Sequence, residues 1–270
     1  MKRVRQLILI AGAVASISAL TIGQASASSG QIVQIEGQHL SPDGARSWGM
    51  RGRIVRTTKL PAGTGYLSIS LAAVPDGQGG AVVSFDDGTS PTNLDVFAQR
   101  IAGDGRLLWR NGVAVATGSS YQANDSLTAT RDGGAFVTVW QPVSSGDELW
   151  LYRLGANGKV LWKQRITAGD PRFSSSDEGA YASFDNGRLR LAWEHFRTDG
   201  RSFDAYLAVY DLAGHRLNGA DGTPLNSDLH AQFLRGFVFD PVRKQGLAVW
   251  DDQRKDNAID FDTRGALYQE

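Results

Sequence analysis

A short phrase recurs four times along the chain and constrains the fold more than any other feature. It reads DGQGGAVVSFDD at 76–87, DGGAFVTVWQ at 132–141, NGRLRLAWEH at 186–195 and KQGLAVWDD at 244–252. Each copy has a turn, an apolar run and a closing aromatic residue, namely Phe85, Trp140, Trp193 and Trp250. The aromatic residues are 55, 53 and 57 residues apart. Self-similarity at such a period predicts a solenoid, a propeller or another array.

A second phrase alternates with the first. It reads GQHLSPDGARSWGMRG at 37–52, AQRIAGDGRLLWRNG at 98–112 and LYRLGANGKVLWKQ at 151–164, with a tryptophan four residues after the turn glycine. A fourth copy, YDLAGHRLNG, has Asn218 in the tryptophan position, and a fifth, FDTRGALYQE, starts at Phe261. The two phrases together give repeat units of roughly 28–60, 61–118, 119–170, 171–225 and 226–270.

The residues of each unit favour β-strands. Asp-Gly and Asn-Gly pairs supply positive φ and close tight hairpins, and the runs between them are β-branched and aromatic. Four strands fit a unit, for example 66–74, 80–85, 94–101 and 107–115. We predict an all-β chain folded as a β-propeller of four-stranded blades, with four or five blades. A pair of β-sandwiches is the alternative, although sandwiches do not need the same aromatic residue in every repeat.

The ends of the chain bear on how a propeller closes and on where the fold begins. The repeat starts with the second half of a unit, so N-terminal strands could pair with the open edge of C-terminal strands. A third strand at 257–263 in the last unit leaves a ring that stops before closure as the other possibility. Residues 1–27 have a basic start, an apolar run shorter than a membrane span and a final A-x-A pattern, which predicts a cleaved secretory signal peptide. We expect residues 28–270 to form one secreted domain, extracellular or periplasmic.

Composition excludes several classes of function. The leader holds three of the 28 basic residues and no acidic residue, so the remainder has 25 basic against 28 acidic side chains, which argues against a nucleic-acid partner. The chain has no cysteine, which excludes thiolate zinc sites and cysteine proteolysis. No two of the four histidines form an i, i+4 or H-x-H pair, so no local zinc site is indicated. No nucleophile elbow, phosphate loop or EF-hand is present, so we expect no metal and no cofactor.

The combination of DGQGGAVVSFDD with LDVFAQRIAGDGRLLWRNGVAV, at 76–87 and 94–115, resembles a repeat of secreted bacterial β-propeller proteins. Units of that family read roughly D-G-x-G-G-A, an aromatic residue followed by an acid, D-I-Y-A-Q-R and G-x-x-x-W. The first unit matches best, and the match covers most of 31–265. The resemblance implies a propeller and an extracellular setting, and it implies no reaction. LYRLGANGKVLWKQ resembles the tryptophan repeat of quinoprotein-type propellers more weakly, over one strand pair per unit.

Acidic residues follow the closing aromatic residue in three of the four copies of the first phrase. In one interpretation, equivalent loops on one propeller face present carboxylates and arginines to a shared ligand, since carboxylates bind sugar hydroxyls. In the other, each arginine pairs with the aspartate that opens the next strand and ties down a hairpin; repetition in each unit favours this one. Trp150 departs from the repeat and is either a stacking platform or buried packing. The candidate ligand-binding residues are Asp86, Asp87, Trp150, Glu194, His195, Arg197, Asp251, Asp252 and Arg254.

The absence of a catalytic motif leads us to predict a non-enzymatic propeller that acts as a binding or cell-surface module for a glycan or a protein. One alternative is a glycoside hydrolase or lyase that uses carboxylates from different blades on one propeller face. A second alternative is a structural repeat array or a fragment of a larger propeller.

Overall fold

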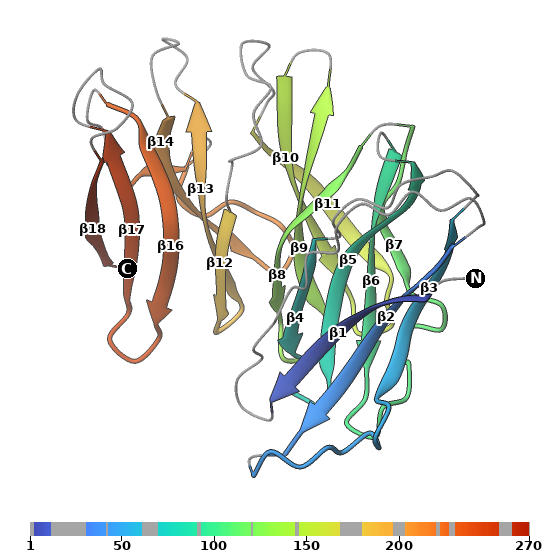
Figure 1. Cartoon of the computed structure of the whole chain (residues 1–270). Coiled ribbons are helices and arrows are strands. Elements are labelled where there is room, and N and C mark those ends of the chain that lie inside the picture. Colours follow the sequence, from blue (N-terminus) through green and yellow to red (C-terminus); the bar gives the residue numbers. More distant parts are fainter. Residues whose placement is uncertain are drawn as a thin grey trace. The chain divides into compact units, whose positions relative to one another are not determined.

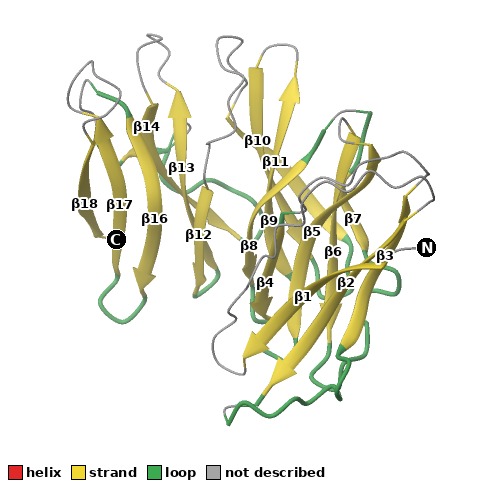
Figure 2. Ribbon diagram, in the orientation of Figure 1, coloured by secondary structure: helices red, strands yellow, loops and turns green. Residues whose placement is uncertain are grey.

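The structure is a computed structural model that describes residues 3–11, 31–41, 43–60, 70–90, 93–119, 121–143, 146–167, 180–196, 203–219, 222–226, 230–253 and 261–269. Over these ranges it contains strands and no helix (Figure 2). The chain divides into two compact units, which are described separately. Unit 1 comprises Met1–Val143 and Glu148–Ile166, and unit 2 comprises Ser144–Asp147 and Thr167–Glu270.

Unit 1 holds two four-stranded sheets in which each strand pairs with the next along the chain (Figure 1). Blade 2 consists of β4 (Leu71–Pro75), β5 (Ala81–Ser90), β6 (Asn93–Ile101) and β7 (Val113–Ala116), all antiparallel. Blade 3 consists of β8 (Ala123–Ala129), β9 (Ala135–Val143), β10 (Gly146–Leu154) and β11 (Val160–Thr167).

A three-stranded sheet, blade 1, precedes these two. It contains β1 (Arg3–Ala11), β2 (Gln31–Leu40) and β3 (Arg53–Leu60). β2 and β3 are antiparallel, whereas β1 pairs with β2 in parallel, from Arg3 opposite Ile32 to Ala11 opposite Leu40. β1 lies within the predicted leader, whose removal stays a prediction.

Unit 2 repeats the same arrangement. Blade 4 consists of β12 (Ala180–Asp185), β13 (Arg188–Phe196), β14 (Phe203–Asp211) and the short β15 (Thr223–Pro224). Blade 5 consists of β16 (Gln232–Asp240), β17 (Gln245–Gln253) and β18 (Phe261–Gln269). The segment expected to start a fifth copy of the second phrase is instead a continuous strand, because Thr263, Arg264 and Gly265 all pair with β17.

The apolar cores lie between successive blades of a unit. One core joins Ile35 and Val55 of blade 1 to Val83 and Phe85 of blade 2. A second core packs blade 2 against blade 3, and a third packs blade 4 against blade 5. Strands with apolar side chains on both faces are therefore explained by neighbours on both sides. Four-stranded sheets stacked in this way are the blades of a β-propeller, and the predicted fold class is confirmed.

Phe85, Trp193 and Trp250 occupy equivalent places in this framework, whereas Trp140 lies on the other face of its strand, because Ala135, Val137 and Val139 take the face toward the preceding blade. Each lies on the second strand of its blade, opposite a residue of the first strand: Phe85 opposite Leu71, Trp140 opposite Ala123, Trp193 opposite Ala180 and Trp250 opposite Leu234. Phe85, Trp193 and Trp250 are buried, and Trp140 is half-buried. The repeat found in the sequence is therefore a repeat of the structure.

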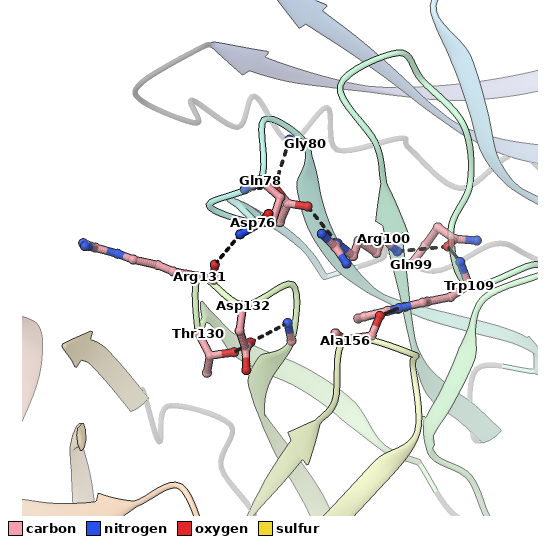
Figure 3. Close-up of polar contacts among 11 residues, drawn as sticks. Asp76, Gln78, Gly80, Gln99, Arg100, Trp109, Thr130, Arg131, Asp132 and Ala156 are labelled. Carbon is pink, nitrogen blue, oxygen red and sulfur yellow. Dashed lines mark hydrogen bonds and ion pairs between the residues drawn. The ribbon is translucent and has the colours of Figure 1, made fainter. Parts of the chain in front are cut away.

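The tryptophans of the second phrase join one blade to the next. The indole Nε1 of Trp48 donates to the carbonyl of Gly103 at 2.8 Å, and that of Trp109 donates to Ala156 at 3.0 Å (Figure 3). We expected Trp109 inside a strand at 107–115, but β7 begins only at Val113. Arg110 and Gly112 both have positive φ, at 51° and 92°, so the chain turns between the tryptophan and the strand.

A buried glutamine holds each of these tryptophan loops in blades 1 and 2. In blade 2, Gln99 Oε1 accepts the N–H groups of Arg100 and Trp109 at 2.9 and 3.0 Å, and Gln99 Nε2 donates to the carbonyl of Arg110. Gln38 makes the same contacts in blade 1. The fully buried side chain thus satisfies loop backbone groups that would otherwise be unpaired.

Blade 4 keeps this loop without either the glutamine or the tryptophan. Ala208 stands in the glutamine position, and Asn218 stands in the tryptophan position. Asn218 Oδ1 accepts the N–H of Val209 at 2.8 Å, which is the counterpart of the Arg100 N–H in blade 2. Its Nδ2 group donates to the carbonyl of Leu207. The fourth copy of the second phrase, which lacks the tryptophan, therefore holds its loop through a different set of hydrogen bonds.

An ion pair fixes the turn between β4 and β5, which lies at the same end of blade 2 as the loop that carries Trp109. Asp76 is buried and pairs with Arg100 Nε at 2.7 Å, and its other oxygen accepts the N–H groups of Gln78 and Gly80 (Figure 3). Gln78 Nε2 donates to the carbonyl of Arg131 at 3.0 Å. This last bond joins the turn of blade 2 directly to the corresponding turn of blade 3.

Candidate active site

The candidate active site lies between blades 2 and 3 in unit 1, where β5 and β9 end and β8 begins. Side chains alternate along β5, so Ser84 and Asp86 share the face that points away from Phe85 and Asp87. The backbone N–H of Asn124, on β8, donates to Asp86 Oδ1 at 2.6 Å. This contact shows that the Asp86 side chain faces blade 3.

Asp86 is a fully buried carboxyl group held by two backbone donors. Besides Asn124, the N–H of Ser70 donates to Oδ2 at 3.2 Å, and the N–H of Asp86 donates back to the carbonyl of Ser70. Burial raises the pKa of Asp86 to about 7, since desolvation outweighs these hydrogen bonds. Ser70 is exposed, so the carboxyl lies within one residue of the surface.

Two polar atoms around Asp86 are buried without a hydrogen-bond partner among the described residues. They are Ser84 Oγ and Asn124 Oδ1. Tyr121 packs edge-to-face on Trp140 with ring centroids 5.8 Å apart, and burial followed by the charge of Asp86 raises the pKa of Tyr121. Unsatisfied polar groups beside a protonatable acid are unusual in a folded interior and mark functional sites.

Asp87 points the other way and forms an ion pair with blade 1. Its Oδ2 atom lies 2.6 Å from Arg56 Nε, and Thr58 Oγ1 donates to Oδ1 at 2.5 Å. Arg56 also lies over the ring of Phe97, at 4.4 Å from the centroid. The two adjacent acids are therefore in opposite environments, one desolvated and the other paired with a cation.

Unit 2 holds a second group of the predicted acids. Asp251 accepts from Arg235 Nε at 2.7 Å, and the Arg235 hydrogen bond lowers the pKa of Asp251. The hydrogen bond to Asp251 is the main cause of the raised pKa of Arg235, and the charge of the buried Glu194 adds to it. Asp252 is buried and lies 3.0 Å from Arg264 Nε. Glu194 lies on β13, and Asp251 and Asp252 lie on β17, so these carboxylates belong to strands rather than to loops.

Trp150 is half-buried and packs against the core between blades 2 and 3. Its Nε1 group donates to Glu148 Oε2 at 2.9 Å, and Lys163 Nζ lies 5.2 Å from its ring. Burial alone would raise the pKa of Glu148, but hydrogen bonds from Trp150, Arg165 and Gln141 lower it overall. The indole thus has a carboxylate at its edge and a cation over its ring.

Other predicted residues lie partly or wholly outside the described part. Arg197 and Arg254 are not described, and for His195 only the backbone is, opposite Asp204 on β14. The pairing of these arginines with the next strand therefore stays a prediction. Asp95, which was expected to take part in such a tie, accepts the N–H of Gly118 at 3.1 Å.

The site also contains residues that the sequence reasoning missed, namely Ser84, Tyr121 and Asn124. Tyr121 and Asn124 belong to the start of the innermost strand of blade 3, which carries no repeated phrase. The group of Asp86, Tyr121 and Asn124 provides a proton donor, a phenol and an amide at one end of the blades. Among the described residues, no three histidine, aspartate or glutamate side chains are grouped so as to hold a metal ion.

No protein-family profile matches the chain, and no curated protein matches its sequence. Solved structures do resemble its fold. A thermostable family-43 glycoside hydrolase aligns with TM-score 0.44 and 8% identity over 79% of each chain. An endo-arabinase from Bacteroides thetaiotaomicron aligns with TM-score 0.40 and 13% identity over 73% of each chain. An ulvan lyase aligns with TM-score 0.47 and 13% identity over 75% of this chain and 51% of that one.

These comparisons correct one prediction. We expected a non-enzymatic binding or cell-surface module, but the similar structures are named as two glycoside-cleaving enzymes and a polysaccharide lyase. The enzymatic alternative agrees better with them and replaces the binding module as the function to be tested. At this level of identity the likeness concerns the fold, so the case for activity has to come from the residues of the chain.

Proposed function

We propose that the protein is a carbohydrate-active enzyme, a glycoside hydrolase or lyase, with Asp86 as its acid. The observation that carries the proposal is a buried carboxyl group at a blade end, beside unsatisfied polar atoms and one residue from the surface. A glycosidase needs a carboxylic acid that keeps its proton near neutral pH to protonate the leaving oxygen. The raised pKa of Asp86 supplies this property.

The neighbouring groups have roles that follow from their positions. Asn124 and Ser70 hold the Asp86 carboxyl through backbone N–H groups, one to each oxygen, which fixes the orientation of the carboxyl group. The amide oxygen of Asn124, which has no hydrogen-bond partner among the described residues, is available to a sugar hydroxyl group once a substrate enters.

A panel of polysaccharides, including arabinan, xylan and uronate-containing chains, tests the proposal. We expect the full chain to release reducing ends, and ultraviolet absorbance of an unsaturated uronate would distinguish a lyase from a hydrolase. Asp86→Asn should lower kcat by about 100-fold or more, whereas Asp104→Asn, an exposed turn aspartate of the same blade, should leave it unchanged. Absence of cleavage on the whole panel, or full activity of Asp86→Asn, would overturn the proposal.

We also propose that the enzyme acts outside the cytoplasm, as the leader at 1–27 indicates. No helix in the described part of the chain is long and apolar enough to cross a membrane. N-terminal sequencing of protein recovered from the medium or periplasm should start at Ser28. Recovery of the intact N-terminus inside the cell would contradict this.

A further inference from the structure

Unit 2 contains a hollow of about 360 Å³ between the turns of blades 4 and 5. One wall comes from the turn between β12 and β13, and the other comes from the turn between β16 and β17. Its lining residues are Asp185, Asn186, Arg188, Arg190, Phe239, Pro241 and Lys244. Three of these side chains are cationic and one is acidic, so the hollow carries net positive charge.

The hollow departs from the repeat. In unit 1 the corresponding turns of blades 2 and 3 touch directly, through the bond from Gln78 to the carbonyl of Arg131. A Cβ atom added to Gly77 would lie 2.8 Å from the Cα atom of Arg131, which shows how closely these turns approach. A contact needed to hold blades together should recur in each blade, whereas a ligand site is needed once.

Arg190 distinguishes this hollow from the equivalent positions in the other blades. It lies three residues before the closing tryptophan of its blade, where the other blades have Val82, Val137 and Leu247. Arg190 is 2% exposed, and its guanidinium carbon lies 3.5 Å from the ring centroid of Phe239. Stacking on an aromatic ring fixes the plane of the guanidinium group, so its N–H groups keep one direction.

Two further cationic side chains, Arg188 and Lys244, line the hollow. Arg188 lies two residues before Arg190 on β13, so it shares the same face of the sheet. Lys244 lies in the facing turn with a φ of 53°, an uncommon conformation for a side chain other than glycine. Asp185 opposes this charge in part, and Asn186 Nδ2 donates to it at 2.6 Å.

We propose that this hollow binds the oxyanion of an acidic sugar, a carboxylate or a sulfate ester. A planar guanidinium group and flanking cations suit an oxyanion with several acceptor atoms, and the volume is in the range of small-molecule sites. The inference that an oxyanion binds follows from the hollow alone, whereas the inference that a sugar carries this oxyanion rests on the proposed function. The site is separate from the Asp86 site, so the two are tested by different measurements.

Calorimetric titration of the full chain at low ionic strength tests the proposal with three probes: sodium glucuronate, sodium sulfate and neutral glucose. We expect glucuronate to bind and glucose not to bind. Arg190→Leu, which installs the residue found in blade 5, and Lys244→Gln should each weaken glucuronate binding by about tenfold or more. Arg243→Gln is the matched control, because it removes an exposed cation of the same turn that pairs with Asp240 and does not line the hollow.

The outcomes separate the parts of the proposal. Binding of sulfate without glucuronate would support the oxyanion site and a sulfate ester as its ligand, and it would overturn a sugar carboxylate. Equal binding of glucose, no binding of either anion, or equal weakening by Arg243→Gln would overturn the site itself. If Arg190→Leu does not fold, as judged by circular dichroism, Lys244→Gln decides. If Asp86→Asn loses glycan cleavage but still binds glucuronate, cleavage and anion binding depend on different sites.

Discussion

Replacement of Asp86 by asparagine should change how the stability of the protein depends on pH. The pKa of Asp86 is about 7 in the folded chain against an ordinary value of 3.8. The folded state therefore binds a proton more tightly than the unfolded state does. The stabilisation that results is fully present below pH 3.8 and is lost as pH rises through about 7.

The magnitude follows from these two values. For a single group, they predict that the free energy of unfolding falls by about 2 kcal/mol between pH 5.5 and pH 8.5 through Asp86 alone. Asparagine cannot ionise, so Asp86→Asn should lack this part of the pH dependence. The asparagine side chain of the variant has one oxygen fewer to accept the N–H of Ser70, which lowers the free energy of unfolding by about 1–3 kcal/mol. This loss is the same at both pH values, so it does not affect the change in stability between them.

Urea unfolding of the wild type and the variant at the two pH values measures the effect. Each of the other titrating groups contributes equally to both proteins, so the difference between their pH dependences isolates Asp86. Asp104→Asn serves as the control, because Asp104 is an exposed residue of the same blade. Parallel pH profiles for wild type and Asp86→Asn would refute a raised pKa at this position and remove the physical basis for its role as an acid.

Three further changes test the repeat framework by urea unfolding. Gln99→Ala should destabilise the protein by about 1–3 kcal/mol, because buried backbone groups of the tryptophan loop lose their partner; an effect below the error of the measurement would contradict this. Trp109→Phe keeps the ring but loses the inter-blade hydrogen bond and should cost about 1 kcal/mol. Gly77→Ala should be worse than Gly79→Ala: both have positive φ, at 74° and 82°, but only Gly77 abuts Arg131; equal losses would refute the close approach.

The sequence was sufficient to predict the blades because the same physical requirement recurs in each. An aromatic residue closing an apolar run packs between sheets, and a glycine with positive φ closes a hairpin. Both signals are local, so they can be read without knowing the rest of the fold. The same local rule failed at Gly265, where the ladder with Val249 on β17 overrides the turn signal.

The candidate site was predicted only in part, because burial and charge depend on neighbours that are distant in sequence. One interpretation of the phrase containing Asp86 made this residue an acid of an exposed loop, whereas in the structure β8 of the next blade covers the carboxyl. Nothing near Asn124 in the sequence points to this contact. The glutamine of the tryptophan loop did leave a signal, since Gln38 and Gln99 each precede their tryptophan by ten residues, but its meaning requires the hydrogen bonds.

Two departures from the repeat in blade 4 show how such residues should be interpreted. Asn218 replaces a tryptophan, and its oxygen takes over a hydrogen bond that a glutamine makes elsewhere, so that change is complete within one loop. Arg190 replaces an apolar residue, and the change extends to the next blade, where Phe239 stacks on it and Lys244 lines the same hollow. A substitution such as Asn218, which restores a hydrogen bond found in the other blades, is explained by the needs of the fold. Arg190 stacked on Phe239, with Arg188 and Lys244 lining the same hollow, is a combination suited to an oxyanion, and for that reason the hollow is the place to look for an anionic ligand.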